Sequence, residues 1–509
     1  MSGYVGDVAY TLGFYRELAP SYLNATCVLN GYEGLKVSDS LRYCELGCGR
    51  GYGTVLLAAA NPNIEFVGID FNPSHIAEAR GLASSAGIKN ITFFEMGFGD
   101  AARSGDQRLS EFNIVGIHGV YSWVMPEVRN EIHQFLRDKL LAGGVVYNSY
   151  NTLPGWTTAA PIQHLIMELS QRSSRDSIAV VNDAFALLKT LADHKSAFIA
   201  QNPGVKARLE RMSKQDKAYL VHEFVNAGWE PLYVTQAMKN LSECKLTYVG
   251  SASLLENRTD LCVPKDLLGV VRDAPDAGMR ELLKDYIVNK QFRRDVYVKG
   301  PQQLSVRDQR QRISELIFSR TLMSKTLPEK FALPIGEIVP KPGTISALLN
   351  SVGERPTSGA DLLASGQRAG ILDSDTVLIL LLLISAGALS PARPDHDKVD
   401  RTSGHRLNSA LMQASAAADT HRFLASPVLG SAIAAPFVDR IVGALAADRN
   451  TSDTDVAASA FDRLRAAGQS FRRDGQALAK SPENIAEIAK MVREFREVRL
   501  PVWRSLALI

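Results

Sequence analysis

The residues best suited to chemistry in the first part of the chain form a glycine-rich stretch, Glu45–Gly53, with the sequence ELGCGRGYG. Glycines at such a bend let the backbone approach a ligand closely, and a helix that follows offers its free N–H groups to that ligand. The dinucleotide-binding pattern G-x-G-x-x-G is not met, because Tyr52 and Thr54 stand where its third glycine is required. The stretch therefore predicts a ligand-binding bend of another type.

An acid follows at a position that suits a nucleoside. Asp70 ends the next predicted strand, 23 residues after Gly47. A carboxylate there can accept both hydrogen bonds from a ribose diol, as it does in dinucleotide-binding folds. Phe71, its neighbour, is expected to lie against an adenine ring. The alternative for Asp70 is an ordinary helix-capping acid.

These residues need a scaffold, and the sequence around them alternates between two kinds of segment. Short apolar runs predict buried strands at Leu41–Leu46, Ile64–Asp70, Ile91–Glu95, Phe112–His118 and Gly144–Tyr150. Helical composition and spacing mark Thr54–Ala60, Pro73–Ala86 and Pro126–Leu140. Strands alternating with helices predict an α/β fold with a parallel, doubly wound, Rossmann-like sheet, which binds ligands beyond the carboxyl ends of its strands.

The last two strands of the sheet are expected only after a long helical segment. Residues 155–240 have helical periodicity and few strand signals, whereas strand-like segments return at Leu246–Ser251 and Arg294–Gly300. We therefore predict one domain over residues 1–300, with a helical insertion at about residues 155–240.

Two further domains are predicted. Residues 301–392 have winged-helix-like spacing, and residues 405–509 are mostly helical, with the polar segment Pro391–Gly404 as a linker. The helices expected in the winged-helix-like domain are Thr344–Ser351, Ser358–Ala364 and a third, capped by Asp373 and Ser374, that ends near Gly387. The third helix begins with acidic residues, which disfavours DNA reading and favours a protein-contacting or dimerising role.

The composition excludes several classes of function. The chain of 509 residues has 57 basic and 54 acidic side chains, a balance that argues against a nucleic-acid groove or an anionic membrane surface. Its five cysteines are odd in number and lack a C-x-x-C pair, so neither a disulfide framework nor a metal site is expected. The longest apolar run, Val377–Ile384, is far shorter than the roughly 20 residues of a membrane span. With no secretory signal at the N-terminus, we expect a cytoplasmic protein.

The motifs resemble a known family. The acid two residues before Gly47 makes the glycine loop similar to that of class I S-adenosylmethionine-dependent methyltransferases. The segments YTLGFYRELAP (10–20), HGVYSW (118–123), YNTLPGW (150–156) and YLVHEF (219–224) resemble bacterial methyltransferases with a methyltransferase regulatory domain, over about residues 4–300 and more loosely beyond. Relatives of this type include rickettsial protein-lysine methyltransferases, which modify outer-membrane protein lysines and are dimeric. The resemblance implies S-adenosylmethionine as cofactor, S-adenosylhomocysteine as product, a protein substrate and a homodimer.

The family pattern also implies functional residues. Those that carry over to cofactor binding are Glu45, Gly47, Gly49, Asp70 and Asp100, the last where the family commonly reads the adenine amino group. From their places in the same loops and strand ends we add Tyr15, Cys48, Phe71, Phe98, His118 and Gly119. The segment from Tyr10 to Tyr15 is expected to form a lid.

The substrate side is expected at the tips of the fourth and fifth strands. An aromatic mouth suits a lysine side chain, because its stem packs on rings and its cation is drawn to their faces. Substrate contacts are expected from Trp123, Asn151 and Trp156, and proton acceptance from Tyr121, Tyr150, His222 or Glu223. The plainer alternatives are packing for the two tryptophans and for Cys48, a solvated polar pair for His222 and Glu223, and a common loop acid for Asp100.

Three functions remain open at this point. Methyl transfer is an in-line displacement that needs mainly positioning, so the absence of hydrolase and metalloprotease motifs is consistent with it. A protein-lysine N-methyltransferase is the leading hypothesis. A small-molecule methyltransferase and a cofactor-binding module without catalysis are the alternatives.

Overall fold

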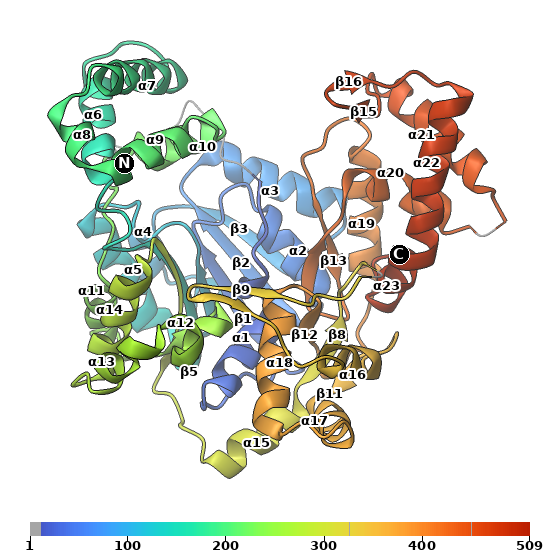
Figure 1. Cartoon of the computed structure of the whole chain (residues 1–509), viewed down its shortest axis with the longest axis horizontal. Helices are drawn as coiled ribbons and strands as arrows, with labels where there is room; N and C mark the ends of the chain where they lie inside the picture. The colour runs from blue at the N-terminus through green and yellow to red at the C-terminus, as the bar shows by residue number, and fades with distance from the viewer. Residues whose placement is uncertain (1–11, 325, 449) are drawn as a thin grey trace.

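A seven-stranded sheet runs through the middle of the molecule (Figure 1) in the computed structural model, which describes residues 12–324, 326–448 and 450–509. Its strands stand in the order β3-β2-β1-β4-β5-β7-β6. Their bounds are β1 Leu41–Leu46, β2 Ile64–Asp70, β3 Ile91–Glu95, β4 Phe112–Ile117, β5 Leu140–Asn151, β6 Leu246–Ser251 and β7 Phe292–Lys299. This sheet confirms the predicted α/β, doubly wound, Rossmann-like fold class.

The strand order reverses beside β1. β1 pairs in parallel with both β2 and β4, so the first three strands extend to one side and β4 and β5 to the other. β7 is antiparallel to β5 and to β6, and therefore begins at the edge of the sheet where β4 and β5 end. Loops from all of these strands meet at that edge, which is where open α/β sheets bind ligands.

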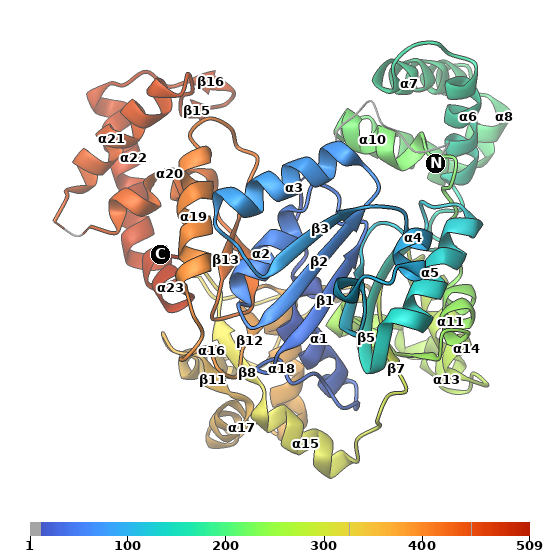
Figure 2. The same cartoon turned by 180° about the vertical axis from the view of Figure 1, so that it is seen from behind.

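Helices cover both faces of the sheet (Figures 1 and 2). The N-terminal ones are η1 Arg16–Leu18, α1 Pro20–Leu29, α2 Tyr52–Ala60, α3 Pro73–Ser85, α4 Phe98–Arg103 and α5 Pro126–Lys139. α3 begins with Pro73 at its first position and Asn72 as its cap, whose side chain accepts from the N–H of Ser74 at 3.0 Å. α2 starts directly after Gly51, whose φ of 70° suits glycine.

Between β5 and β6 the chain is helical, as the sequence predicts. The helices are α6 Ala160–Gln171, α7 Ser177–Asp193, α8 Ala197–Gln201, α9 Pro203–Met212, α10 Lys217–Phe224 and α11 Val234–Ser242. The first five share an apolar core of their own, which includes Ile162, Val181 and Leu220. Three more helices, α12 Thr259–Cys262, α13 Leu268–Arg272 and α14 Ala277–Val288, precede β7. The division into domains stays a prediction.

The next part of the chain places four helices beside a small sheet of order β11-β8-β12. Its elements are α15 Val306–Glu315, β8 Ile317–Arg320, β9 Phe331–Leu333, β10 Gly336–Ile338, α16 Thr344–Ser351, β11 Thr357–Ser358, α17 Gly359–Arg368, α18 Asp373–Ser385 and β12 Leu389–Ala392. The predicted cap of α18 is wrong. Its cap residue is Leu372, which makes no side-chain cap bond, and Asp373 instead forms an ion pair with Arg310.

The predicted linker Pro391–Gly404 is packed into the molecule at its start. Pro391 belongs to β12, and Arg393 is fully buried, where it donates to Asn61 at 2.8 Å and pairs with Asp395. Because these partners satisfy the charge, the Arg393 guanidinium lies inside the molecule, whereas Lys398 and Asp400 later in the segment are exposed.

The final part of the chain is mostly helical, with two short hairpins. Its elements are α19 Thr402–Ala414, β13 Phe423–Ser426, β14 Ser431–Ala434, α20 Phe437–Ala446, α21 Asp453–Ala466, β15 Arg472–Arg473, β16 Gln476–Ala477, α22 Pro482–Glu494 and α23 Leu500–Ser505. Figure 2 shows α19 and β13 beside α2. Across the described ranges, no helix has the length and apolar character that a membrane crossing requires.

Candidate active site

The glycine loop leaves open space where a ligand can approach the backbone. Gly47 and Gly49 have φ values of 73° and 54°, which favour glycine. A Cβ at Gly47 would lie 2.4 Å from Val120 Cγ2, whereas a Cβ at Gly49 would meet no atom within 4 Å. The N–H of Gly47 donates to the Ile69 carbonyl at 2.8 Å and fixes the loop to the end of β2. The loop is therefore anchored on one side and open on the other.

Asp70 lies directly against this loop. Its Oδ2 accepts from the Gly49 N–H and its Oδ1 from the Asn72 N–H, both at 2.9 Å, and the residue is only 7% exposed. A carboxylate has about four lone-pair sites, so two such bonds leave acceptor capacity for ribose hydroxyls. The structure thus brings together the glycine loop and the acid, as the sequence predicts.

Glu45 lies beneath the loop and is buried. Its Oε2 accepts from Thr54 Oγ1 at 2.6 Å. Burial raises the pKa of Glu45 to about 7, and the charge of Asp70 acts in the same direction, although the Thr54 bond opposes it. Glu45 therefore changes its charge close to neutral pH.

The other predicted cofactor residues differ in their surroundings. Cys48 and Phe71 are half-buried, and burial raises the pKa of the Cys48 thiol. Phe98 is buried in the apolar core on the α4–α5 side of the sheet. Asp100 has a side chain that is 72% exposed and pairs with Arg103 on its own helix at 2.9 Å. Its part in reading adenine stays a prediction that these contacts do not support.

At the end of β4, His118 is held between rings and hydroxyls. The ring of Tyr15 stacks on it with centroids 3.6 Å apart. Its Nδ1 lies 3.0 Å from the Tyr147 hydroxyl and 3.1 Å from Ser149 Oγ, which also accepts from the Gly119 N–H at 3.0 Å. Tyr15 therefore covers the end of β4 from the N-terminal segment. Tyr10 and Thr11, which begin the expected lid, lie outside the described residues.

The aromatic wall continues onto β7. Phe292 is 6.2 Å from His118 and 6.5 Å from Trp123 between ring centroids, and the Arg294 guanidinium lies 5.3 Å from the Phe292 ring. Burial, with a contribution from Arg294, lowers the pKa of His118 to about 3, so this histidine is neutral at pH 7. Sequence reasoning missed Phe292 and Arg294. Phe292 and Arg294 are two residues apart at the start of β7, so they lie on the same face of the sheet. This spacing points to the site only if the strand is known to be antiparallel.

Glu223, from α10, places a buried carboxylate against the end of β5. Its Oε1 accepts from Asn151 Nδ2 at 2.6 Å and from Trp229 Nε1 at 3.1 Å, and Tyr219 also bonds to it. Burial raises its pKa, although these bonds oppose the rise. His222 is also buried, so the alternative of a solvated pair is wrong. Tyr219, within the YLVHEF motif, is a further site candidate that was not singled out from the sequence.

Three predicted substrate-side residues are packed into the interior instead. Tyr121 is fully buried with its hydroxyl 2.7 Å from His133 Nε2, and Tyr150 donates to Asp295 at 2.6 Å. Strand alternation sends Tyr150 to the face opposite Ser149. Trp156 donates to the Gln291 carbonyl at 2.6 Å within the core of the helical insertion. The roles of these three side chains in catalysis or substrate contact stay predictions that these contacts do not support.

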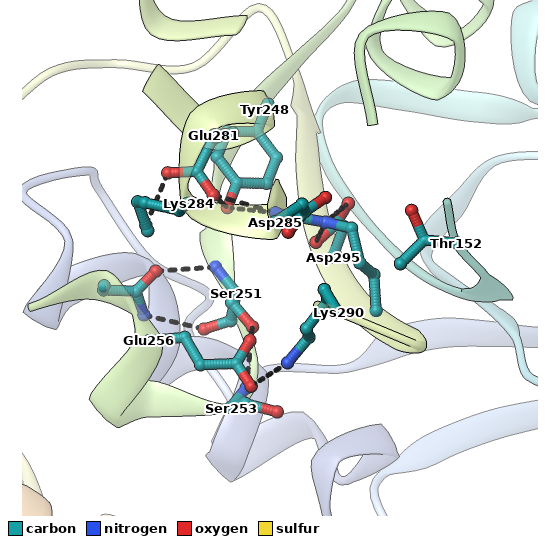
Figure 3. A network of polar contacts seen from close by, with 12 residues as sticks. Thr152, Tyr248, Ser251, Ser253, Glu256, Glu281, Lys284, Asp285, Lys290 and Asp295 are labelled. Atoms are coloured by element: carbon teal, nitrogen blue, oxygen red, sulfur yellow. Dashed lines mark hydrogen bonds and ion pairs between the residues drawn. The ribbon is translucent and has the colours of Figure 1, made fainter. Parts of the chain in front are cut away.

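A buried ionic network joins α14 to β7 close to this edge of the sheet. Arg293 pairs with Asp285, Asp295 and Glu281 at 2.6–3.0 Å. Figure 3 shows these three carboxylates gathered beside Tyr248, with Lys284 bonded to Glu281. Against the effect of burial, Arg293 and Lys284 lower the pKa of Glu281 to about 2. The network fixes the start of β7, and with it Phe292 and Arg294.

Two family models and several known proteins match this chain. Residues 37–247 match the model of a methyltransferase domain, and residues 216–299 match that of the predicted methyltransferase regulatory domain. The uncharacterized protein sll1526 of Synechocystis is 32% identical over 507 residues, which are 99% of each chain. The uncharacterized protein RP789 of Rickettsia prowazekii is 28% identical over 289 residues, 56% of this chain and 51% of that protein. In fold, the chain resembles PKMT2 from Rickettsia typhi in complex with AdoHcy, with a TM-score of 0.70, 19% identity, and coverage of 98% of this chain and 99% of that one.

The sheet, the glycine loop and the acid that ends β2 thus define an S-adenosylmethionine-dependent methyltransferase. The chain belongs to the family of methyltransferases that carry the predicted methyltransferase regulatory domain. The residues present fit the cofactor: open space at Gly49 admits the ligand beside the backbone, and Asp70 retains acceptors for its ribose.

Proposed function

We propose that this methyltransferase modifies the ε-amino group of lysine side chains in a protein substrate. The observation that carries the proposal is the buried carboxylate of Glu223, which Asn151 holds at the end of β5, the edge of the sheet where we expect the substrate. The resemblance of the sequence motifs to those of bacterial methyltransferases with a regulatory domain, and the fold shared with PKMT2 solved in complex with AdoHcy, support it.

The aromatic wall suits the stem of a lysine. Tyr15, His118, Phe292 and Trp123 follow one another with ring centroids 3.6–6.5 Å apart at the edge where β4 and β5 end. Methylene groups pack well on such rings, and a cationic head is attracted to their faces. His118 is neutral and so does not repel that cation.

Glu223 can take the proton that an ammonium must lose before it attacks a methyl group. Its raised pKa brings its proton affinity closer to neutral pH, as general-base catalysis favours. Asn151 and Trp229 hold the carboxylate in place, and Tyr219 bonds to it as well. When bound, S-adenosylmethionine supplies an electrophilic methyl group on a positively charged sulfur. The remaining task of the protein is to align acceptor and donor.

The test is methyl transfer from labelled S-adenosylmethionine by the full chain, with a cell lysate as substrate and mass spectrometry to find the modified residues. Methyl-lysine in proteins is the expected result. Label only in the small-molecule fraction would contradict the proposal, and tight cofactor binding without any label would favour a binding module.

Replacement of Glu223 by Gln tests the role of the carboxylate. General-base catalysis contributes about 10²–10⁴-fold to rate, so we expect kcat to fall within that range while S-adenosylhomocysteine binds as before. The matched control is Glu256→Gln, which removes a partly buried carboxylate that pairs with Lys290. A Glu223→Gln enzyme with wild-type kcat would show that another group accepts the proton.

One observation favours a second candidate, a small acceptor that carries a carboxylate. The Arg294 Nε is buried and has no hydrogen-bond partner among the described residues, and its guanidinium lies beside Phe292 in the aromatic wall. A carboxylate would satisfy this donor. The same labelling experiment separates the two, because this acceptor would appear in the small-molecule fraction.

A further inference from the structure

Hydrogen bonds join the β13–β14 hairpin of the C-terminal region to both ends of helix α2, which follows the glycine loop. Figure 2 shows β13 beside α2. At the start of α2, the Tyr52 hydroxyl donates to the Phe423 carbonyl and accepts from the Phe423 N–H, both at 2.9 Å. The His421 ring packs edge-on against Tyr52 with centroids 5.0 Å apart. At the far end, Asn61 donates to the Gly430 carbonyl at 2.9 Å.

The same hairpin also contacts the N-terminal segment. The Phe14 ring lies 5.5 Å from that of Phe423, and Ser21 Oγ donates to the Leu429 carbonyl at 2.6 Å. The residue after Phe14 is Tyr15, whose ring covers the histidine at the end of β4. One hairpin therefore touches the helix of the cofactor loop and the segment that covers the acceptor side.

Separating the hairpin from the start of α2 would cost free energy. Tyr52 is only 3% exposed, so separating the hairpin from α2 would leave its hydroxyl and the Phe423 N–H and carbonyl without protein partners. The first part of the glycine loop is held to the end of β2 through the N–H groups of Gly47 and Gly49. Its last residue, Gly51, leads directly into α2, so the position of this end of the loop depends on the helix that begins at Tyr52.

We propose that the β13–β14 hairpin is a positioning element of the cofactor site, and that Tyr52 is the positioning residue through which the C-terminal region sets cofactor affinity. Tyr52 touches no reacting atom. It acts by holding the first turn of α2, and hence the backbone N–H groups beyond the loop, in the orientation that the cofactor requires.

The first test is calorimetric titration of the full chain with S-adenosylhomocysteine. Tyr52→Phe keeps the ring and removes both hydrogen bonds to Phe423, so we expect its Kd to rise at least fivefold. The matched control is Tyr22→Phe, which removes an equally buried hydroxyl that donates to the Ala252 carbonyl at 3.0 Å and not to the hairpin. Its Kd should stay within twofold of wild type. Thermal unfolding of both variants verifies that they are folded.

The second test distinguishes positioning from general loss of stability. Coupling between two sites is reciprocal, so a hairpin that strengthens cofactor binding must itself be held more firmly when the cofactor is bound. We expect S-adenosylhomocysteine to slow amide hydrogen exchange at residues 423–434 in wild type and in Tyr22→Phe, but not in Tyr52→Phe.

Equal Kd values for Tyr52→Phe and wild type would overturn the proposal. So would amide exchange rates in the wild-type hairpin that do not change when S-adenosylhomocysteine is added. Either result leaves the cofactor assignment intact. A wild-type chain that binds no S-adenosylhomocysteine would instead contradict the cofactor assignment, and this proposal with it.

Discussion

At the scale of single residues, the best evidence for a ligand site is a carboxylate whose charged form is disfavoured by burial. Glu45 is 8% exposed and its partner, the Thr54 hydroxyl, is neutral, so its charged form is disfavoured. A buried acid with a raised pKa directly below an open glycine loop is what a cationic ligand can stabilise. Such groups cluster at functional sites.

Glu45 makes the stability of the protein depend on pH. Its folded pKa of about 7 lies above the ordinary value of 4.5, so its contribution is fully present below pH 4.5 and is lost as pH rises through 7. Relative to Glu45→Gln, the unfolding free energy of wild type should fall by up to about 3 kcal/mol over that window. Urea denaturation of both proteins between pH 4.5 and 8 measures this. Parallel pH curves would show that Glu45 does not titrate there.

The loop and its acids could be predicted from the sequence, whereas the burial of several aromatic side chains could not. Glu45 and Asp70 were predictable because spacing along a strand and its loop is local information. Tyr121 and Tyr150 were not, because their exposure depends on the side of the sheet that each ring faces and on distant partners, His133 and Asp295.

At the scale of elements, the direction of strand β7 decides which of its side chains reach the candidate site. The strand-like segment at its position was predictable, and β6 has the predicted bounds. The apolar pattern of the segment does not give the antiparallel direction of β7, and it is this direction that brings Phe292 and Arg294 to the edge where β4 and β5 end.

The network that holds β7 against α14 should be costly to break. Arg293→Met removes the cation shared by Asp285, Asp295 and Glu281, which then remain buried without it. Removing one partner of a buried pair costs about 3–5 kcal/mol, and urea denaturation should show a loss of that size.

A surface pair provides the control for this measurement. Arg272→Met removes an arginine whose side chain is 79% exposed and pairs with Asp273. Exposed pairs contribute at most about 1 kcal/mol, so equal losses in the two variants would mean that the buried network adds no stability.

At the scale of the whole molecule, the polar contacts between distant segments were the least predictable. Asn61 and Gly430 are 369 residues apart, yet they share a buried hydrogen bond. Arg393 lies in a segment that composition alone marks as a linker, and only its partners explain its burial. Such contacts leave no periodic pattern in the sequence. The homodimer implied by the family resemblance stays a prediction.

The central claim is that the cofactor is held between the glycine loop and Asp70, and calorimetry with S-adenosylhomocysteine tests it most directly. Wild type should bind, and Asp70→Ala should bind at least tenfold more weakly, because it loses the carboxylate that we expect to hold the ribose hydroxyls and that accepts the Gly49 N–H. Equal affinity in the two proteins, with both folded, would contradict the account.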